Sequence, residues 1–184
     1  MNVYDWDNTI YAGDSTADFI CYLFWHYPKT LLNVPRILVF GLGFVLHMVP
    51  KQTFKEQVFH LFVYVPDMMK ATREFCISHL DHVKGFYQQK EDDVVISASP
   101  EFLVKEFGRL LHIQYTMASP VHQKTGRYEG LNCHGKEKVR RFYECFPKGE
   151  IEEFYSDSLS DDPLAKLAKK AFLVKKDQLI SWPK

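Results

Sequence analysis

The second half of the chain alternates short apolar runs with segments of helical periodicity. Four runs have the length and the bounding turns of strands, and they cover 93–98, 113–117, 152–156 and 171–174. Three segments with apolar residues at helical spacing cover 101–111, 136–146 and 163–170. A continuous apolar run such as Val94-Val95-Ile96 is typical of a strand that is covered on both faces. This alternation predicts an α/β fold with a parallel sheet and helices on both of its faces.

The first half of the chain is mainly helical after one short strand. That strand is predicted over 2–6, and a helix capped by Asp14 or Ser15 follows it. Helical periodicity returns at 52–65 and 67–80. A crossover between parallel strands needs about a dozen residues or somewhat more, and the gap between the first two strands is far longer. We therefore expect a helical subdomain inserted between them.

Leu31–Val49 is the most apolar stretch of the chain. Its continuous part, Ile37–Val49, is too short to cross a bilayer comfortably. We expect a buried or half-buried helix here. Contact with a membrane surface or a lipid tail is the second, less favoured interpretation.

Composition narrows the class of partner. The 184 residues include 23 Lys and Arg and 23 Asp and Glu, so the formal net charge is zero and nucleic acid is not an expected partner. The four cysteines are scattered and contain no C-x-x-C pair, which indicates neither a zinc site nor a disulfide framework. Reduced thiols and an opening strand in place of a secretory leader predict a cytoplasmic protein. The oligomeric state is left open.

The first strand runs into the stretch with the clearest chemical pattern, Asp5-Trp6-Asp7-Asn8-Thr9. Residues two apart in an extended strand point the same way, so Asp5 and Asp7 are expected to reach one site. Carboxylates this close repel, and one stays protonated unless a cation lies between them. The pair suits a carboxylate nucleophile beside an acid–base group. An ordinary turn rich in Asp and Asn is the alternative interpretation.

The second strand also ends in polar residues, and open α/β sheets bind ligands beyond the carboxyl ends of their strands. The sequence there is Ser97-Ala98-Ser99-Pro100, in which Ser99 is expected to cap the next helix and Pro100 to begin it. Helix N-terminal amides bind phosphate, and Ser97 adds a hydroxyl donor. Ser97 and Ala98 are therefore candidate phosphate-binding residues.

One lysine and two further aspartates complete the set of candidates. Lys136 begins a predicted helix after a loop that could return to the site, although an ordinary charged helix face explains it equally well. Asp157 ends the fourth strand, and Asp161 lies one turn later. Carboxylates of this kind suit a hard cation. A Mg²⁺ ion bound between Asp157 and the pair that follows the first strand would offset the repulsion among these carboxylates.

These pieces, in this order, resemble the haloacid dehalogenase superfamily of phosphohydrolases, and most closely its phosphoserine-phosphatase-like branch. That branch carries D-x-D-x-T, a Ser or Thr at the end of the second strand, a Lys, and D-x-x-x-D. The matching residues here are Asp5, Asp7, Thr9, Ser97, Lys136, Asp157 and Asp161. The match extends from Asn2 to about Val174.

The resemblance implies a Rossmann-like catalytic core and a cap that covers its site. The core would comprise 1–13 and 91–184, and the all-helical cap would comprise 14–90. A cap of this kind excludes water and selects the substrate.

The resemblance also implies a Mg²⁺-dependent phosphatase that works through an aspartyl-phosphate. Asp5 would attack phosphorus, and Asp7 would protonate the leaving oxygen and then activate water. The Mg²⁺ ligands would be Asp5, Asp7 (through its backbone carbonyl) and Asp157. The phosphoryl group would be bound by Ser97, Ala98 and Lys136. Supporting roles would fall to Thr9 and Asp161.

Two departures from the branch bear on the substrate. The branch often has glycines after the second-strand Ser and reads G-D-G-x-N-D in its acidic motif, whereas this chain has Ala98-Ser99-Pro100 and Ser156-Asp157-Ser158. Neither change removes a catalytic group, but both weaken the case for phosphoserine. We expect a small phosphorylated metabolite. The alternative is a lipid-phosphate phosphatase of the phosphatidylglycerophosphate type that uses Leu31–Val49.

Overall fold

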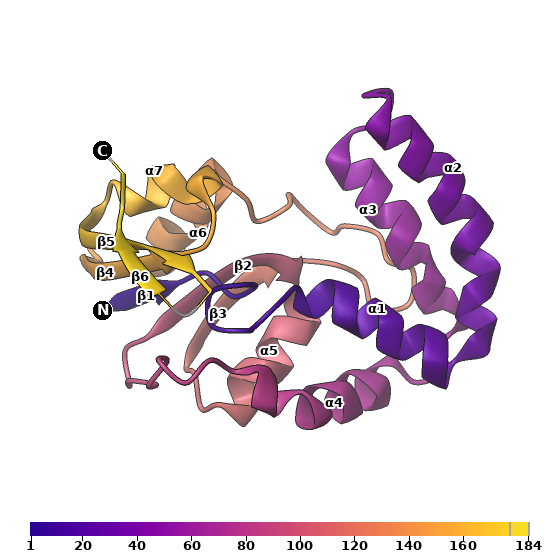
Figure 1. The fold of residues 1–184 in the computed structure, drawn as a ribbon, viewed down its shortest axis with the longest axis horizontal. Helices are drawn as coiled ribbons and strands as arrows, with labels where there is room; N and C mark the ends of the chain where they lie inside the picture. Colours follow the sequence, from indigo (N-terminus) through magenta and orange to yellow (C-terminus); the bar gives the residue numbers. More distant parts are fainter. Residues whose placement is uncertain (177, 184) are drawn as a thin grey trace.

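A computed structural model describes residues 1–176 and 178–183. One sheet runs through the described residues, with strand order β3-β2-β1-β4-β5-β6 (Figure 1). Its strands are β1 Asn2–Tyr4, β2 Val94–Pro100, β3 Tyr115–Ser119, β4 Ile151–Ser156, β5 Ala168–Lys175 and β6 Gln178–Ser181. The first five are parallel, and β6 is antiparallel to β5. The predicted α/β fold is confirmed.

The short strand β1 lies at the centre of the sheet. Val3 is in register with Val94 on one side and with Phe154 on the other, and all three side chains are buried. The carboxyl ends of β1, β2 and β4 therefore meet at one edge, because parallel neighbours end on the same side of a sheet. This register places the chain segments after these strands next to one another.

Helices cover both faces of the sheet. One apolar core contains α5, Glu101–Leu110, through Phe107, and the other contains α6, Lys136–Cys145, through Phe142. A shorter helix, α7, spans Asp162–Ala165. Because adjacent residues of β1 point to opposite faces, Val3 packs into one core and Tyr4 into the other.

The predicted helix at 163–170 is wrong in its second half. The helix ends at Ala165, and β5 begins at Ala168 and pairs with β4. Lys169 and Lys170 are exposed while Leu173 and Val174 are buried, so the local pattern contains no clear strand alternation. Pairing with β4 decides the outcome, which is a tertiary effect. The predicted positions of the other strands and of α5 and α6 agree with the structure to within a few residues.

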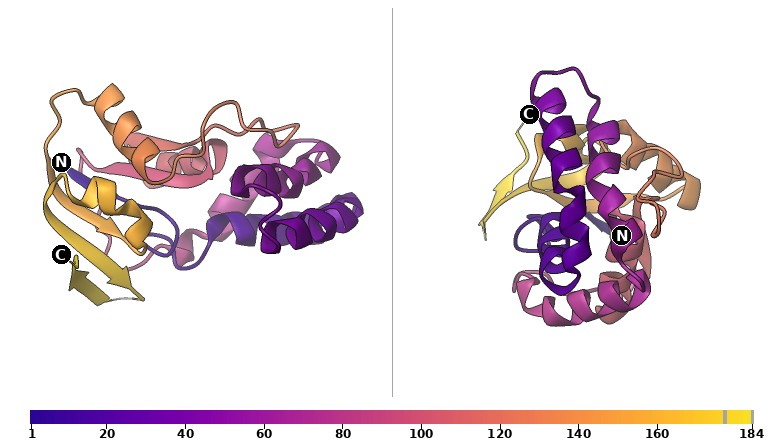
Figure 2. Two further views of the ribbon diagram at one scale, coloured as in Figure 1. Left: turned by 90° about the horizontal axis from the view of Figure 1, so that it is seen from above. Right: turned by 90° about the vertical axis from the view of Figure 1, so that its right-hand side faces the viewer.

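The inserted segment folds into four α-helices: α1 Ser15–His26, α2 Val34–Val45, α3 Lys51–Phe59 and α4 Met68–Ser78. 3₁₀ turns join α1 to α2 and α3 to α4. Of the two candidate caps for α1, Asp14 is the one that caps the helix, because its side chain accepts a hydrogen bond from the backbone amide of Ala17 at 3.0 Å. The helices α2 and α3 form a hairpin that projects away from the sheet, whereas α4 runs beside α5 (Figures 1 and 2).

The helices α1 and α4 share an apolar core with the sheet. Phe19 of α1 and Phe75 of α4 lie 5.1 Å apart, and Phe75 also contacts Phe107 of α5. The hairpin of α2 and α3 joins this core only at the end of α3, where Phe59 is buried and Val58 packs against it. The division of the chain at residues 13 and 90 into core and cap stays a prediction.

The apolar helix α2 is half-buried on one side and exposed on the other. Its inner side packs on α3, where Phe44 and Phe54 stack at 5.1 Å. None of the α2 residues, all of which are described, is fully buried. The helix is therefore half-buried, which is one of the two forms expected for this stretch. The described residues contain no helix that is long and apolar enough to cross a membrane.

Candidate active site

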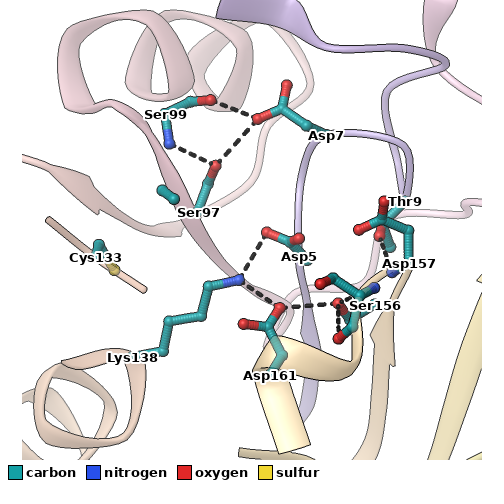
Figure 3. Close-up of polar contacts among 12 residues, drawn as sticks. Asp5, Asp7, Thr9, Ser97, Ser99, Cys133, Lys138, Ser156, Asp157 and Asp161 are labelled. Atoms are coloured by element: carbon teal, nitrogen blue, oxygen red, sulfur yellow. Dashed lines mark hydrogen bonds and ion pairs between the residues drawn. The ribbon is translucent and has the colours of Figure 1, made fainter. Parts of the chain in front are cut away.

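Polar side chains gather where the carboxyl ends of β1, β2 and β4 meet (Figure 3). Asp5 and Asp7 follow β1, Ser97 belongs to β2, and Asp157 follows β4. The backbone amide of Asp5 still donates to Tyr155 of β4 at 2.8 Å, so Asp5 is held in the plane of the sheet. The predicted aspartates and Ser97 therefore lie on one edge.

A buried lysine of α6 joins two of the aspartates. The Lys138 ammonium donates to Asp5 Oδ1 at 2.8 Å and to Asp161 Oδ2 at 2.7 Å, and its side chain is only 2% exposed. Ser156 adds a hydroxyl hydrogen bond to the same Asp161 oxygen at 2.8 Å. Asp161 and Ser156 thus fix the position of the ammonium, and the ammonium in turn fixes one oxygen of Asp5.

The lysine at the site is Lys138, and the prediction of Lys136 is corrected. Lys136 is exposed in the first turn of α6, whereas Lys138 lies two residues on, roughly 200° around the helix. The sequence contained a usable signal, because Lys138 is four residues before Phe142 and so lies on the apolar face of α6. A lysine on a buried face needs an anionic partner, and Asp5 and Asp161 supply it.

Asp7 is oriented by serines from two other segments. Its Oδ1 accepts the amide of Ser15 at 2.7 Å and the Ser15 hydroxyl at 2.6 Å. Its Oδ2 accepts a very short hydrogen bond from the Ser99 hydroxyl and lies 3.5 Å from Ser97 Oγ. The start of α1 therefore helps to set the geometry of the site, a role that the sequence analysis did not assign to Ser15.

Ser99 has a different role from the one predicted. The strand β2 continues to Pro100, which occupies the N-cap position of α5 and makes no side-chain cap. The Ser99 hydroxyl instead bonds Asp7 and accepts from Thr16 Oγ1 at 2.8 Å. Capping by Ser99 is thus wrong. Ser97 Oγ accepts the amide of Ser99 at 3.0 Å, and this bond holds the end of β2 in place.

Thr9 ties the loop after β1 to the end of β4. Its hydroxyl oxygen accepts the backbone amide of Asp157 at 3.0 Å. The preceding residue, Asn8, has φ of 56°, a left-handed conformation that Asn tolerates better than most residues. The hydrogen bond to this tight turn therefore holds Asp157 at the same edge of the sheet as Asp5.

A cavity of about 320 Å³ opens beside Asp7, between the end of β2 and the inserted helices. Its walls include apolar side chains of α1 and α3, among them Ile20 and Phe54. From α3, Lys55 reaches across and donates to the carbonyl of Ala98 at 3.0 Å. Burial lowers the pKa of Lys55. Two larger hollows, of about 540 and 630 Å³, border Gln123 and Lys124, and neither is lined by the site aspartates.

Comparison with known proteins identifies the family. A family model of haloacid dehalogenase-like hydrolases matches residues 3–166. The chain belongs to this family. The predicted resemblance to the haloacid dehalogenase superfamily is confirmed. No curated protein matches the sequence.

Solved structures with the same fold have low sequence identity to this haloacid dehalogenase-like hydrolase. A protein of unknown function from Bordetella pertussis Tohama I has a TM-score of 0.77 and 17% identity over 94% of this chain and 88% of its own. A phosphoserine phosphohydrolase-like protein from Francisella tularensis has a TM-score of 0.53 and 15% identity over 94% and 87%. A probable phosphoserine phosphatase from Vibrio cholerae has a TM-score of 0.59 and 10% identity over 92% of this chain and 55% of its own. These similarities show the shared fold.

The site of this hydrolase has an excess of negative charge. Burial raises the pKa of Asp5 from 3.8 to about 7, and the charges of Asp161 and Asp7 add to the effect while Lys138 opposes it. Burial also raises the pKa of Asp7, against the hydrogen bonds from Ser15 and Ser99, and that of Asp157. For Lys138, burial disfavours the charged form, but the two carboxylates outweigh it and raise the pKa. Four carboxylates around one ammonium favour the binding of a further cation.

The donor set fits Mg²⁺ with water in its coordination shell. Within the described residues, no three His, Cys, Asp or Glu side chains form a ready-made metal site. The carboxylate of Asp7 is occupied by serines, so the acidic side chains that could hold the metal are Asp5 and Asp157. The backbone carbonyl of Asp7 would be the third oxygen. Mg²⁺ keeps several waters and is often bound by only one or two carboxylates, so this set is sufficient.

The raised pKa of Asp5 predicts that this group makes the metal-free protein less stable as pH rises. The folded state holds this proton more tightly than the unfolded chain, so the contribution of Asp5 to stability is fully present below the unfolded pKa of 3.8 and is lost as pH approaches 7. Asp7 and Asp157 act in the same direction, whereas His60 and His134, whose pKa values are lowered by burial, act in the opposite one. In thermal unfolding with EDTA, the wild type should therefore lose about 1 to 2 kcal/mol relative to Asp5→Asn between pH 5.5 and 7. A difference between the two proteins that stays constant, or that changes with the opposite sign, would contradict the assignment.

Proposed function

We propose that this hydrolase is a Mg²⁺-dependent phosphatase that cleaves a phosphomonoester through an aspartyl-phosphate at Asp5. The observation that supports it best is the pairing of a carboxylate fixed by a buried ammonium with a second carboxylate oriented by serines. This pairing supports Asp5 as the nucleophile and Asp7 as the acid–base group. The names of fold neighbours, which include phosphoserine phosphatases, agree with this chemistry.

The first half-reaction transfers the phosphoryl group to the enzyme. An Asp5 oxygen forms the new bond to phosphorus as the bond to the leaving oxygen breaks, and Asp7 donates a proton to that oxygen. Lys138, which contacts Asp5, and the hydroxyl of Ser97, which lies beside Asp7, would bind the phosphoryl oxygens as charge spreads onto them. Mg²⁺ bound by Asp5, the Asp7 carbonyl and Asp157 would supply further charge neutralisation.

The second half-reaction releases phosphate. Asp7, now ionised, accepts a proton from a water molecule as that water attacks phosphorus, and the bond to Asp5 breaks. The hydrogen bonds from Ser15 and Ser99 hold the Asp7 carboxylate in one orientation for both proton transfers. The net burial effect raises the pKa of Asp7, which favours its protonated form at the start of the cycle.

The cavity beside Asp7 bears on the class of substrate. Its volume of about 320 Å³ lies at the lower end of the range typical of small-molecule pockets. Lys55 and Lys51 border it together with apolar side chains, so it is suited to a phosphorylated molecule with both anionic and apolar parts. A small phosphorylated metabolite is the simplest substrate of this kind.

Metal dependence tests the proposed function. We expect hydrolysis of an aryl phosphate such as p-nitrophenyl phosphate to be lost after thorough EDTA treatment and restored by Mg²⁺. The physical reason is that the carboxylates around Asp5 repel an anionic substrate unless a cation offsets them. Zn²⁺ and Ca²⁺ added after EDTA serve as controls for a general ionic effect. Undiminished hydrolysis in EDTA would contradict the proposal.

A further inference from the structure

The outer side of α2 is an uninterrupted apolar stripe that faces solvent. Its large side chains recur at helical spacing and are 57 to 71% exposed: Leu38, Val39, Leu42, Val45 and Leu46. The inner side of the same helix packs on α3 through Phe44. A helix that is apolar on both sides is usually covered on both sides, in a protein core or in lipid.

The stripe continues onto the segments that flank α2. Leu31 and Leu32 before the helix, and Met48 after it, are 50 to 76% exposed, and Trp25 at the end of α1 is 84% exposed. We name these residues, together with the stripe, the tip patch. Figures 1 and 2 show α2 at the end of the molecule opposite the sheet and both chain termini. Large clustered apolar surfaces of this kind mark interaction sites.

The chain segment that carries the tip patch contains basic but no acidic residues. Residues 19–55 contain no Asp or Glu, although the whole chain is formally neutral. Lys29, Arg36 and Lys51 lie in this segment, and all three are exposed. Exposed apolar side chains bordered by basic residues match the surface of a membrane that contains anionic lipids.

The alternatives fit the patch less well. At 12 residues, α2 is about 18 Å long, well short of the roughly 30 Å hydrocarbon core, so it is suited to lie in the interface and not to span the bilayer. A second copy of the chain would bring two basic segments together, and like charges disfavour that contact. A membrane surface offers both apolar depth and opposite charge.

The tip patch is connected to the site through α3. Phe54 stacks on Phe44 of α2 and also lines the cavity beside Asp7, and Lys51 and Lys55 of α3 border the same cavity. The hairpin of α2 and α3 thus presents its outer layer to the surroundings and its inner layer to the site.

We propose that the tip patch docks in the interface of an anionic membrane and that the site takes its phosphomonoester from a lipid headgroup there. The second part rests on the proposed phosphatase function, and it selects the membrane-resident class of substrate over a soluble metabolite. Docking itself is independent of catalysis.

Vesicle binding tests the docking. We expect the protein to float with vesicles of phosphatidylcholine and phosphatidylglycerol in equal amounts, and to bind more weakly to phosphatidylcholine alone or at high salt. Leu38→Ser/Leu42→Ser should lower the partition coefficient by about tenfold or more, since it removes two leucine side chains that would enter the membrane. Met69→Ser/Ile77→Ser on α4 is the matched control, because those side chains are 73% and 51% exposed away from the patch.

Trp25 provides a second measurement that does not depend on the leucine variants. Its emission should shift to the blue on binding, and Trp25→Phe should remove the shift. Of the other two tryptophans, Trp6 is fully buried already, and the half-buried Trp182 packs on Phe154 of β4, away from the patch. Absence of flotation and of an emission shift with anionic vesicles would overturn the docking. So would a dimer in light scattering that Leu38→Ser/Leu42→Ser converts to monomer without any vesicle binding.

The substrate class is tested with phosphatidic acid in vesicles and glycerol 3-phosphate as its soluble counterpart. We expect a kcat/KM for the vesicle substrate at least tenfold higher, and Leu38→Ser/Leu42→Ser should remove this preference while hydrolysis of p-nitrophenyl phosphate is unchanged. Equal rates on the two substrates would overturn the lipid assignment. If the wild type does not hydrolyse p-nitrophenyl phosphate at all, that result would instead count against the proposed function and would leave the docking result unaffected.

Discussion

Asp5→Asn is expected to reduce turnover by roughly ten-thousandfold or more, to the background of the assay, because the amide is a poor nucleophile for phosphorus. Asn retains the shape of the side chain and can still accept a hydrogen bond from Lys138 through its oxygen. The fold should therefore survive the substitution. Steady-state hydrolysis of p-nitrophenyl phosphate measures the loss, and circular dichroism checks the fold.

Asp7→Asn separates the nucleophile from the acid–base group. It should lower turnover about a hundredfold to ten-thousandfold, the usual scale for general acid–base catalysis. Because Asp5 is intact in this variant, rapid quenching should still trap a phosphorylated protein, with an acyl-phosphate that hydroxylamine cleaves. Asp5→Asn should trap none. A trapped phosphoryl group on the Asp5→Asn protein would show that another residue is the nucleophile.

Lys138→Met is expected to reduce kcat about a hundredfold to a thousandfold, the range seen when one charge-stabilising group is removed from a site. The Lys138 ammonium lies 2.8 Å from Asp5 and is the cation that bonds both Asp5 and Asp161. Its removal leaves two buried carboxylates unpaired, with a stability cost of about 3 to 5 kcal/mol. Kinetics and thermal unfolding should therefore both be affected.

Lys136→Met is the matched control, since it removes the same charge from the same helix two residues away. Lys136 is exposed and should tolerate the change, with kcat within about twofold of the wild type. Lys138→Arg, which keeps the charge, should fold even if the Met variant does not, and should retain part of the rate. A large loss at Lys136 with none at Lys138 would reverse the assignment.

The contrast between Lys136 and Lys138 shows what the sequence alone could not determine. The order of the motifs predicts a lysine at the start of the helix after the third strand, but it does not determine which lysine of that turn faces the site. In the structure, Lys138 shares the buried side of α6 with Phe142. The helical period contained that information, but only the packing of α6 on the sheet gave the buried side a neighbour at Asp5.

Ser15 and Ser99 show a second limit. The sequence pattern makes both candidate helix caps, because capping is a common local role of a serine before a helix. Their bonds to Asp7 join three segments that are far apart in the sequence, the loop after β1, the start of α1 and the end of β2. Local propensity cannot contain such contacts, because they depend on the parallel register of β1 and β2.

The sequence by itself determined the α/β class, the long helical insertion, the family and the aspartates that follow β1 and β4. These features depend on local periodicity, on the length of the gap between strands and on residue types at strand ends, which can all be read along one chain. The tertiary structure alone decided that Lys138 reaches Asp5, that β5 replaces the end of a helix, and that the outer side of α2 is uncovered. Each of these depends on which segment, distant in the sequence, packs against the residue in the fold. Burial against that segment outweighs the local secondary-structure propensity.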